Sequence, residues 1–283
     1  VALSGDGGDE LMRGYGRYDR AVQPWEKMRR IPLKVRQAIG KLLLNVPAAT
    51  WDSSFAWLNP LFSQVAPNDP FGEKIYKIGD AFNQPDFLSF YKYKISQYKN
   101  PEQVVVHSKE SLSILDVARS NTFFQDNDIA MLFVDAMMYL PDDILVKVDR
   151  AAMGVSLETR IPLLDHRVVE FVWRLPNRFR WQPGCNKWAL RQVLYRYVPQ
   201  AILDRPKQGF GVPVTDWLKG PLYDWCDNLL DAERIKTHGL FNAELVAQLW
   251  RQHQSGRYNR DGTLWAVLMA GAMHRTGCRD FTY

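Results

Sequence analysis

Residues 1–10 read VALSGDGGDE, in which a short apolar run enters a loop with three glycines and three acidic residues. An apolar run that ends in glycines is typical of the carboxyl end of a β-strand, and the residues from Glu10 to Tyr18 favour a following helix. A parallel strand needs neighbouring strands and helices on both faces. We therefore predict one strand at residues 1–3, belonging to a larger sheet. Because the sequence opens without Met inside this run, we expect the chain to be part of a longer protein.

Helical periodicity dominates the rest of the chain. Proline residues fall between the apolar-periodic segments or in their first turns, as expected of helix boundaries. The predicted fold class is therefore mainly α, with the single strand at the start. The predicted helices are residues 32–45, 71–82, 87–98, 128–139, 142–155, 167–175, 187–198, 243–253 and 263–274.

Two segments carry more specific expectations. Pro141 is expected at the first position of a helix, with Asp142 and Asp143 in its first turn. Residues 47–70, rich in Pro, Asn, Ser and Trp, are the least regular part of the sequence. They are predicted to form an insertion or a mobile connection.

The composition is that of a globular protein. Of the 283 residues, 46% are hydrophobic, which is enough for a sizeable core. The net charge of +5, from 36 basic and 31 acidic residues, is a mild bias, so no nucleic-acid partner is expected. Cys185, Cys226 and Cys278 are far apart and form neither a disulfide framework nor a zinc motif, which makes reducing cytoplasm the default location. No apolar run approaches the roughly 18 residues of a membrane span.

The loop SGDGGDE is the first candidate for chemistry. Glycines between a strand and a helix expose backbone N–H groups where a phosphate can bind. Asp6 and Asp9 would repel a bare phosphate, so the loop suits a nucleotide that carries Mg²⁺ held between carboxylates and phosphate oxygens. The residues match neither the P-loop nor the dinucleotide-binding pattern. A tight turn with acidic N-caps explains the same residues, and both interpretations stay open.

Residues 204–213, DRPKQGFGVP, are the second candidate. Arg205 and Lys207 flank a proline, and two glycines follow, which gives a stiff turn that presents cations and allows close backbone approach. Lys207 could stabilise developing charge on a phosphate or pyrophosphate. A basic surface loop is the simpler interpretation of these residues alone.

Four stretches taken together resemble, in order, the synthetase domain of glutamine-dependent asparagine synthetases. They are LSGDGGDELMRGYGRY from residue 3, LPDDILVKVDRAAMGVSLETRIPLLDHRVVEFVWRLP from residue 140, KWALRQVL from residue 187 and RPKQGFGVPVTDWL from residue 205. The resemblance covers most of residues 1–219. It implies a partial domain over residues 1–283: the C-terminal helical portion of an α/β ATP-pyrophosphatase fold, with residues 220–283 as a helical extension.

The resemblance also implies a reaction and its site residues. Members of that family use ATP and Mg²⁺ to convert the side-chain carboxylate of aspartate to an acyl-adenylate, release pyrophosphate and let glutamine-derived ammonia displace AMP. By position, Ser4 and Gly5 would contact ATP, and Asp6 would accept a proton from the attacking ammonia. Asp9 would bind the Mg²⁺-pyrophosphate, and Lys207 would contact the departing phosphates. These expectations make Asp6 and Lys207 the catalytic candidates and Asp9 the metal ligand.

Other expectations concern what surrounds the site. Asp149, Arg150, Glu158 and Arg160 are predicted to form a buried ion-pair frame behind it. The pyrophosphate loop S-G-G-x-D-S of the family does not occur in the 283 residues, nor does the N-terminal glutaminase domain, so the chain alone is expected to be inactive. A homodimer is left open.

Two alternatives remain. One is a non-catalytic helical interaction module, and the other is an amide ligase acting on a different carboxylate in polysaccharide or peptide modification.

Overall fold

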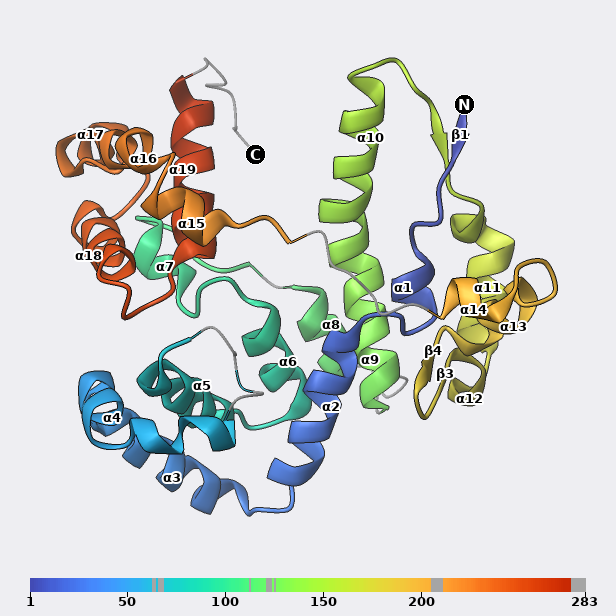
Figure 1. Ribbon diagram of the computed structural model, residues 1–283, viewed down its shortest axis with the longest axis horizontal. Coiled ribbons are helices and arrows are strands. Elements are labelled where there is room, and N and C mark those ends of the chain that lie inside the picture. The colour runs from blue at the N-terminus through green and yellow to red at the C-terminus, as the bar shows by residue number, and fades with distance from the viewer. Residues whose placement is uncertain are drawn as a thin grey trace. The chain divides into compact units, whose positions relative to one another are not determined.

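The computed structural model describes residues 1–62, 65, 69–111, 113–120, 124, 126–204 and 211–275 (Figure 1). The chain divides into two compact units, each built from separated stretches of sequence. Unit 1 comprises Val1–Ile31, Pro85–Lys94 and Leu112–Gln208, and unit 2 comprises Pro32–Gln84, Ile95–Ser111 and Gly209–Tyr283. Both units are mainly helical, which confirms the predicted class.

Unit 1 contains the strands that the structure describes and a set of mostly short helices. In chain order its elements are β1 (Ala2–Leu3), α1 (Gly8–Leu11), α2 (Gly16–Met28), α6 (Phe87–Ile95), α8 (Ile114–Ser120), α9 (Asn127–Val134), η3 (Asp135–Leu145), α10 (Val146–Met153), β2 (Thr159–Arg160), η4 (Pro162–Leu164), α11 (His166–Arg174), α12 (Asn177–Arg180), β3 (Trp181–Gln182), β4 (Cys185–Asn186), α13 (Trp188–Leu194) and α14 (Gln200–Leu203).

Unit 2 is helical throughout the part that the structure describes. Its elements are α3 (Leu33–Asn45), α4 (Ala48–Ser54), η1 (Ala56–Phe62), α5 (Phe71–Asn83), α7 (Pro101–Val104), α15 (Val214–Lys219), α16 (Tyr223–Leu229), α17 (Ala232–His238), α18 (Ala243–Gln254) and α19 (Asp261–Arg275). In neither unit is any described helix both long and apolar enough to cross a membrane.

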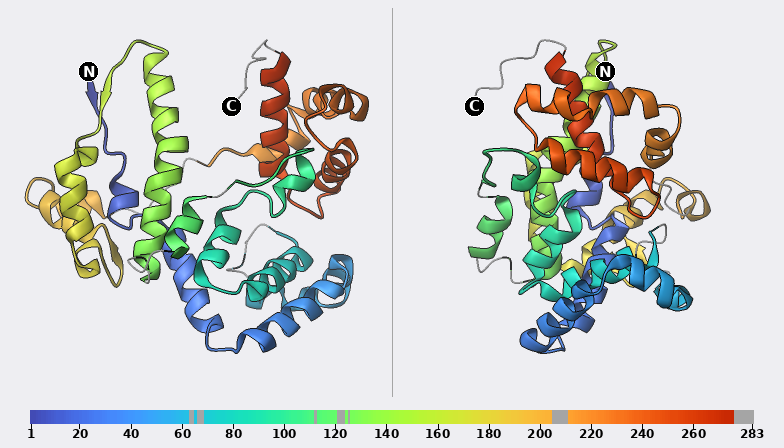
Figure 2. Two further views of the ribbon diagram at one scale, coloured as in Figure 1. Left: turned by 180° about the vertical axis from the view of Figure 1, so that it is seen from behind. Right: turned by 90° about the vertical axis from the view of Figure 1, so that its left-hand side faces the viewer.

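The predicted strand at the start of the chain has a partner. β1 pairs in parallel with β2, with Ala2 opposite Thr159 and Leu3 opposite Arg160, and the two lie side by side (Figure 2). β3 and β4 form a separate antiparallel pair. The prediction of a single strand was therefore wrong, because β2 and the β3–β4 pair are too short for their sequences to show a strand period.

The helix predicted over Glu10–Tyr18 is also wrong, because it breaks between α1 and α2. Arg13 has a left-handed backbone with φ 56°, which a continuous right-handed helix excludes. The amide of Gly14 donates to the carbonyl of Asp9 at 2.8 Å and closes the turn between the two helices. The chain therefore turns between α1 and α2 instead of continuing as one helix.

Pro141 does not start a helix. α9, η3 and α10 form one continuous helix, and η3 is a π-helical segment with Pro141 inside it (Figure 1). Proline normally ends a helix because it lacks an N–H and clashes with the carbonyl four residues earlier. The wider π turn moves that carbonyl away, so the helix continues through the proline.

Aromatic packing forms the core of unit 1. Trp25 on α2 stacks on Phe90 with ring centroids 5.7 Å apart and meets Phe87 edge-on at 5.9 Å. Tyr18 and Met131 are fully buried beside them in the same unit. This core fixes α2, α6 and α9 and so supports the loop that precedes α2.

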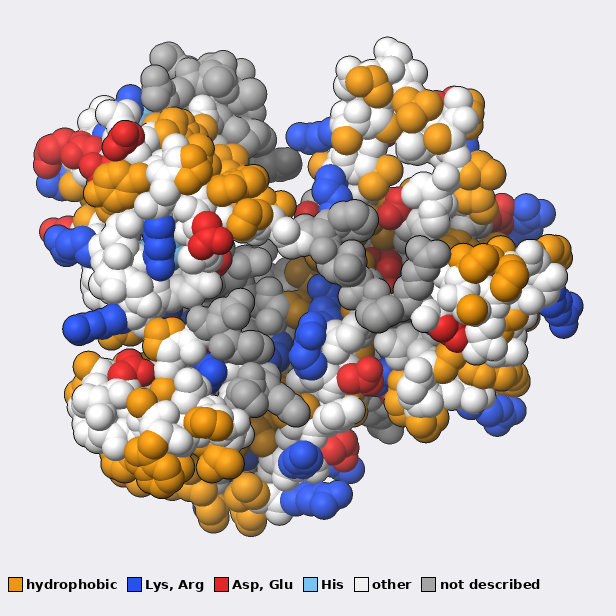
Figure 3. Space-filling view, viewed as in Figure 1, with side chains coloured by type: hydrophobic (Ala, Val, Ile, Leu, Met, Phe, Trp, Pro, Cys, Tyr) orange, Lys and Arg blue, Asp and Glu red, His pale blue; other side chains and the backbone are white. Residues whose placement is uncertain are grey.

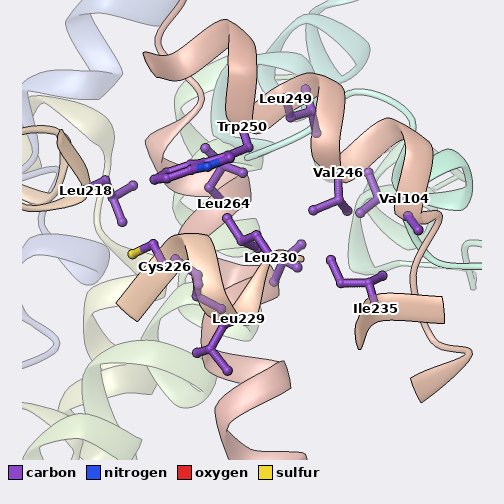
Figure 4. Close-up of a cluster of buried hydrophobic side chains, with 13 residues drawn as sticks. Val104, Leu218, Cys226, Leu229, Leu230, Ile235, Val246, Leu249, Trp250 and Leu264 are labelled. Carbon is purple, nitrogen blue, oxygen red and sulfur yellow. The ribbon is translucent and has the colours of Figure 1, made fainter. Parts of the chain in front are cut away.

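Aliphatic packing around Trp250 forms the core of unit 2. The side chains come from α7 and from α15 to α19, and they point toward one another (Figure 4). Burial raises the pKa of the Cys226 thiol in this core to about 11. The buried residues are Val104, Leu218, Cys226, Leu229, Leu230, Ile235, Ala243, Val246, Leu249, Trp250, Leu264, Val267 and Leu268.

Residues 47–62 are regular rather than an irregular insertion, since α4 and η1 occupy most of them. Hydrophobic side chains gather over α3 and α4 on the surface (Figure 3). On its other face, α3 approaches α5 so closely that a Cβ on Gly40 would lie 2.7 Å from the carbonyl oxygen of Gly79. The remainder of the predicted irregular segment lies largely outside the described residues.

The predicted buried ion-pair frame does not exist. Asp149, Arg150, Glu158 and Arg160 are all exposed, and the pair between Glu158 and Arg160 lies on the surface of β2. The face of α10 that carries Arg150 points to solvent. The buried face of this helix is the one that carries Ala152.

Candidate functional site

The β1–β2 pair positions the glycine loop. The amide of Ala2 donates to the carbonyl of Glu158 at 2.8 Å, and the amide of Ser4 donates to the carbonyl of Arg160 at 2.9 Å. The loop therefore leaves the carboxyl end of a parallel strand, where open α/β sheets bind their ligands. The side chain of Ser4 donates a hydrogen bond to the carboxylate of Asp6.

Two glycines allow the loop to press against η4. Gly7 has φ 79°, and a Cβ there would lie 2.5 Å from Cδ2 of Leu164. A Cβ on Gly8 would lie 3.0 Å from Cδ1 of Leu163. Gly5 differs, because no described atom lies within 4 Å of the place its Cβ would take. The backbone at Gly5 is therefore open to a ligand, while Gly7 and Gly8 are required for packing.

Asp9 faces a lysine from a distant part of the chain. Nζ of Lys187 lies 3.0 Å from Oδ1 of Asp9, and the Asp9 side chain is 24% exposed. The backbone of Lys187 is left-handed, with φ 55°, and its amide donates to the carbonyl of Met12 at 3.2 Å. Two contacts therefore tie the start of α13 to the turn after α1.

Gly14 lies directly beneath this ion pair. A Cβ added to Gly14 would overlap both Oδ1 of Asp9 and Cε of Lys187. Because the backbone of Gly14 also closes the turn on Asp9, the glycine sets how closely the two charged groups approach.

A buried polar network lies behind the loop. The hydroxyl of Tyr15 donates to Glu10 at 2.6 Å, and burial raises the pKa of Glu10 although this hydrogen bond opposes the shift. The guanidinium of Arg17 lies over the Tyr15 ring at 4.4 Å and over the Tyr139 ring at 4.2 Å. It donates to Asp135 at 2.6 and 3.1 Å.

The network reaches α6 through Asp135. The hydroxyl of Tyr91 donates to the other carboxylate oxygen of Asp135 at 2.8 Å. Burial raises the pKa of Tyr91, and the charge of Asp135 adds to the shift. The hydrogen bonds therefore connect α1, α2, η3 and α6 into one support for the loop.

Three of the predicted site residues, Ser4, Gly5 and Asp6, lie on the loop, and Ser4 and Asp6 are in direct contact. Asp9 follows in the first turn of α1. Lys207 lies outside the described residues. Sequence reasoning missed Lys187 as a partner of Asp9, although the stretch KWALRQVL begins at that lysine.

The loop and the start of α1 offer carboxylates that could take part in a Mg²⁺ site. Among the described residues, no group of three or more His, Cys, Asp or Glu side chains is placed to hold a metal ion by itself. Mg²⁺ in nucleotide sites is bound by one or two carboxylates plus phosphate oxygens, which needs no such group. Asp9 fits this arrangement, because its carboxylate is partly exposed on a loop whose backbone at Gly5 is open.

Comparisons with known proteins show the family to which the chain belongs. The sequence profile of the family described as asparagine synthase matches residues 1–275. Asparagine synthetase (glutamine-hydrolyzing) 1 of Bacillus subtilis is 30% identical over 281 residues, which cover 97% of this chain and 40% of that protein. A putative asparagine synthetase (glutamine-hydrolyzing) of Mycobacterium bovis is 27% identical over 277 residues, covering 97% of this chain and 39% of that protein.

The chain belongs to the asparagine synthase family, a family of ATP-dependent ligases. It spans about two fifths of the length of these two relatives. No solved structure gave a significant match.

Proposed function

We propose that the full-length protein carrying this chain is an asparagine synthetase-like amide ligase. It forms an acyl-adenylate from ATP and a carboxylate, with aspartate as the substrate, and transfers ammonia derived from glutamine. The observation that carries the proposal is the ion pair between Asp9 and Lys187. Their charged atoms lie 3.0 Å apart, and Asp9 directly follows a glycine loop at the carboxyl end of a parallel strand. The family assignment supplies the reaction class.

The loop residues divide the work of binding. Ser4 and the open backbone at Gly5 would bind ATP, and Asp9 would hold the Mg²⁺ that accompanies the pyrophosphate. When bound, Mg²⁺ neutralises charge on the phosphate oxygens. Lys187 keeps the carboxylate of Asp9 in place and adds a positive charge beside the departing pyrophosphate. Lys207 contacts the same phosphates.

Asp6 acts in the second half of the reaction. Its carboxylate accepts a proton from ammonia as the nitrogen attacks the acyl carbon and AMP leaves. The hydrogen bond from Ser4 orients that carboxylate. An acid at this position favours an amine nucleophile, because the attacking nitrogen must lose a proton.

The architecture of the whole protein is part of the proposal. β1 and β2 are two strands of the parallel sheet of an α/β ATP-pyrophosphatase domain, since a parallel pair is stable only within a larger covered sheet. The pyrophosphate loop and an N-terminal glutaminase domain complete the enzyme, and residues 220–283 form a C-terminal helical extension. The enzyme works in the cytoplasm in asparagine biosynthesis.

Acyl-adenylate formation by the full-length protein tests the proposal. ATP–pyrophosphate exchange is measured with Mg²⁺ and a panel of carboxylic acids that includes aspartate, glutamate and β-alanine. We expect exchange that depends on aspartate, and asparagine as the product when ammonia or glutamine is added. Exchange with another acid would identify a different substrate within the same reaction class. If no carboxylate supports exchange, the chain belongs to a non-catalytic interaction module.

A further inference from the structure

A depression lies in unit 1, between α2 on one side and the β3–β4 pair with α13 on the other. Its volume is about 280 Å³. The residues that line it are not among the proposed ATP, metal or proton-transfer residues. They are Asp19, Gln23, Trp181, Gly184, Asn186 and Arg191.

Arg13 organises one wall of this depression. Its side chain is only 4% exposed, and its guanidinium lies over the Trp181 ring at 4.6 Å. It donates to Oδ1 of Asp19 at 2.9 Å and to Asp128 at 2.9 Å. The indole and the Asp19 carboxylate are thus fixed from behind, while the Asp19 side chain remains 31% exposed.

Arg191 provides a cation on the other wall. Its Nε donates to the carbonyl of Asn186 at 3.0 Å, and its Nη1 pairs with Asp204. The side chain is still 30% exposed. The depression therefore presents a carboxylate from α2 and a guanidinium from α13, and both are held in place by other groups of the protein.

The charge and the size of the lining restrict the ligand. Asp19 and Arg191 each have a partner of opposite sign, so the lining has no excess positive charge of the kind that phosphate-bearing ligands require. At about 280 Å³ the depression lies at the small end of ligand sites, which favours a ligand smaller than a nucleotide. A small molecule with both an ammonium and a carboxylate matches the two charges, and Trp181 offers an apolar surface for its side chain.

We propose that this depression binds a zwitterionic α-amino acid, with its ammonium group on Asp19 and its carboxylate on Arg191. The amides of Gln23 and Asn186 add hydrogen-bonding groups for a polar side chain. Asn186 directly precedes Lys187, and its amide donates to the carbonyl of Gly14 at 3.5 Å, so the ligand would lie next to the turn that supports Asp9.

Isothermal titration calorimetry of the full chain tests this site. The probes are L-asparagine, L-aspartate, L-glutamine and L-glutamate, with acetate and methylammonium as single-charge controls. We expect saturable binding of at least one amino acid, and a loss of about tenfold or more in affinity for Asp19→Asn and for Arg191→Gln. Glu26→Gln, at a partly exposed position on α2, and Arg196→Gln, at an exposed position after α13, should bind as the parent does.

A third variant keeps the test clear if the charge changes disturb folding. Gln23 is exposed, and Gln23→Trp would fill the depression without removing any of the ion pairs described above. It should abolish binding while the circular dichroism spectrum stays that of the parent. The proposal is overturned by no saturable binding at about 10 mM amino acid. Binding unchanged in all three variants, or acetate or methylammonium binding as tightly as the amino acid, would also overturn it.

Discussion

Asp9 and Lys187 lie far apart in sequence, yet Nζ of Lys187 is 3.0 Å from Oδ1 of Asp9. The contact joins α1, directly after the glycine loop, to the residue that precedes α13. A second contact joins the same segments, because the amide of Lys187 donates a hydrogen bond to the carbonyl of Met12. A carboxylate that is to bind Mg²⁺ needs a fixed orientation, and a departing pyrophosphate needs a nearby cation. Lys187, at the start of α13, provides both the contact that orients Asp9 and the cation.

Asp9→Asn tests the metal role. Removing the charge while keeping the shape should reduce Mg²⁺-dependent pyrophosphate release by the full-length protein about 100-fold or more. The matched control is Asp224→Asn, an exposed aspartate on α16, which should retain the parent rate. Near-normal pyrophosphate release by Asp9→Asn would exclude Asp9 as the metal ligand.

Lys187→Met tests whether the pair is used in the reaction. Loss of a charged donor beside the departing pyrophosphate should slow its release about tenfold or more, and Lys187→Arg should retain most of the rate. Lys34→Met, an exposed lysine on α3, is the control. A Lys187→Met variant that is as fast as the parent, but melts at a lower temperature, would show that the pair only stabilises the fold.

Gly14→Ala tests the packing under the pair. The new methyl group would overlap both Asp9 and Lys187, and we expect it to destabilise unit 1 by about 1–3 kcal/mol, measured by urea denaturation. Gly16→Ala, at the first residue of α2, meets nothing within 4 Å among the described residues. It should leave stability unchanged or slightly raised, because alanine favours the helix. Equal effects of the two substitutions would contradict the packing argument.

Local sequence patterns predicted what depends on nearby residues. The helix expected over 32–45 is α3 (Leu33–Asn45), and the one expected over 71–82 is α5 (Phe71–Asn83). Apolar spacing in such helices is set within a few turns of the same segment, so the sequence contains the needed information. The loop containing Ser4, Asp6 and Asp9 could be found for the same reason.

Long-range features could not be read from local patterns. Leu3 pairs with Arg160, and Lys187 contacts Asp9. In both cases the two segments are separated in the sequence by many intervening helices. Pro141 in η3 also escaped local rules, because a π turn carries the helix through a residue that normally ends one. The roles of Ser4, Gly5, Asp6, Asp9 and Lys207 stay predictions for the experiments above.

Arg17→Lys tests the network behind the loop. A lysine keeps the charge but loses the planar contact with the Tyr15 and Tyr139 rings and one of two hydrogen bonds to Asp135. We expect a loss of about 1–2 kcal/mol in the free energy of unfolding, measured in urea. Arg20→Lys, an exposed position on the same helix, should change it little. Parent-like stability of Arg17→Lys would show that charge alone holds Asp135.

Glu10→Gln tests the buried carboxyl group. Its pKa in the folded protein is raised above 4.5 by burial, so the unfolded chain loses this proton first as pH rises. The ionised form therefore costs stability above pH 4.5, and the cost grows until the pH passes the folded pKa. Glutamine can still accept the hydrogen bond from Tyr15 and carries no charge. The variant should melt at a higher temperature than the parent at about pH 8, and the difference should vanish near pH 4.

The control is Glu26→Gln, which removes a largely solvent-accessible carboxylate paired with Arg29 and should melt close to the parent. A Glu10→Gln variant that melts below the parent at about pH 8 would mean that its negative charge is stabilised by the fold, contrary to the burial argument.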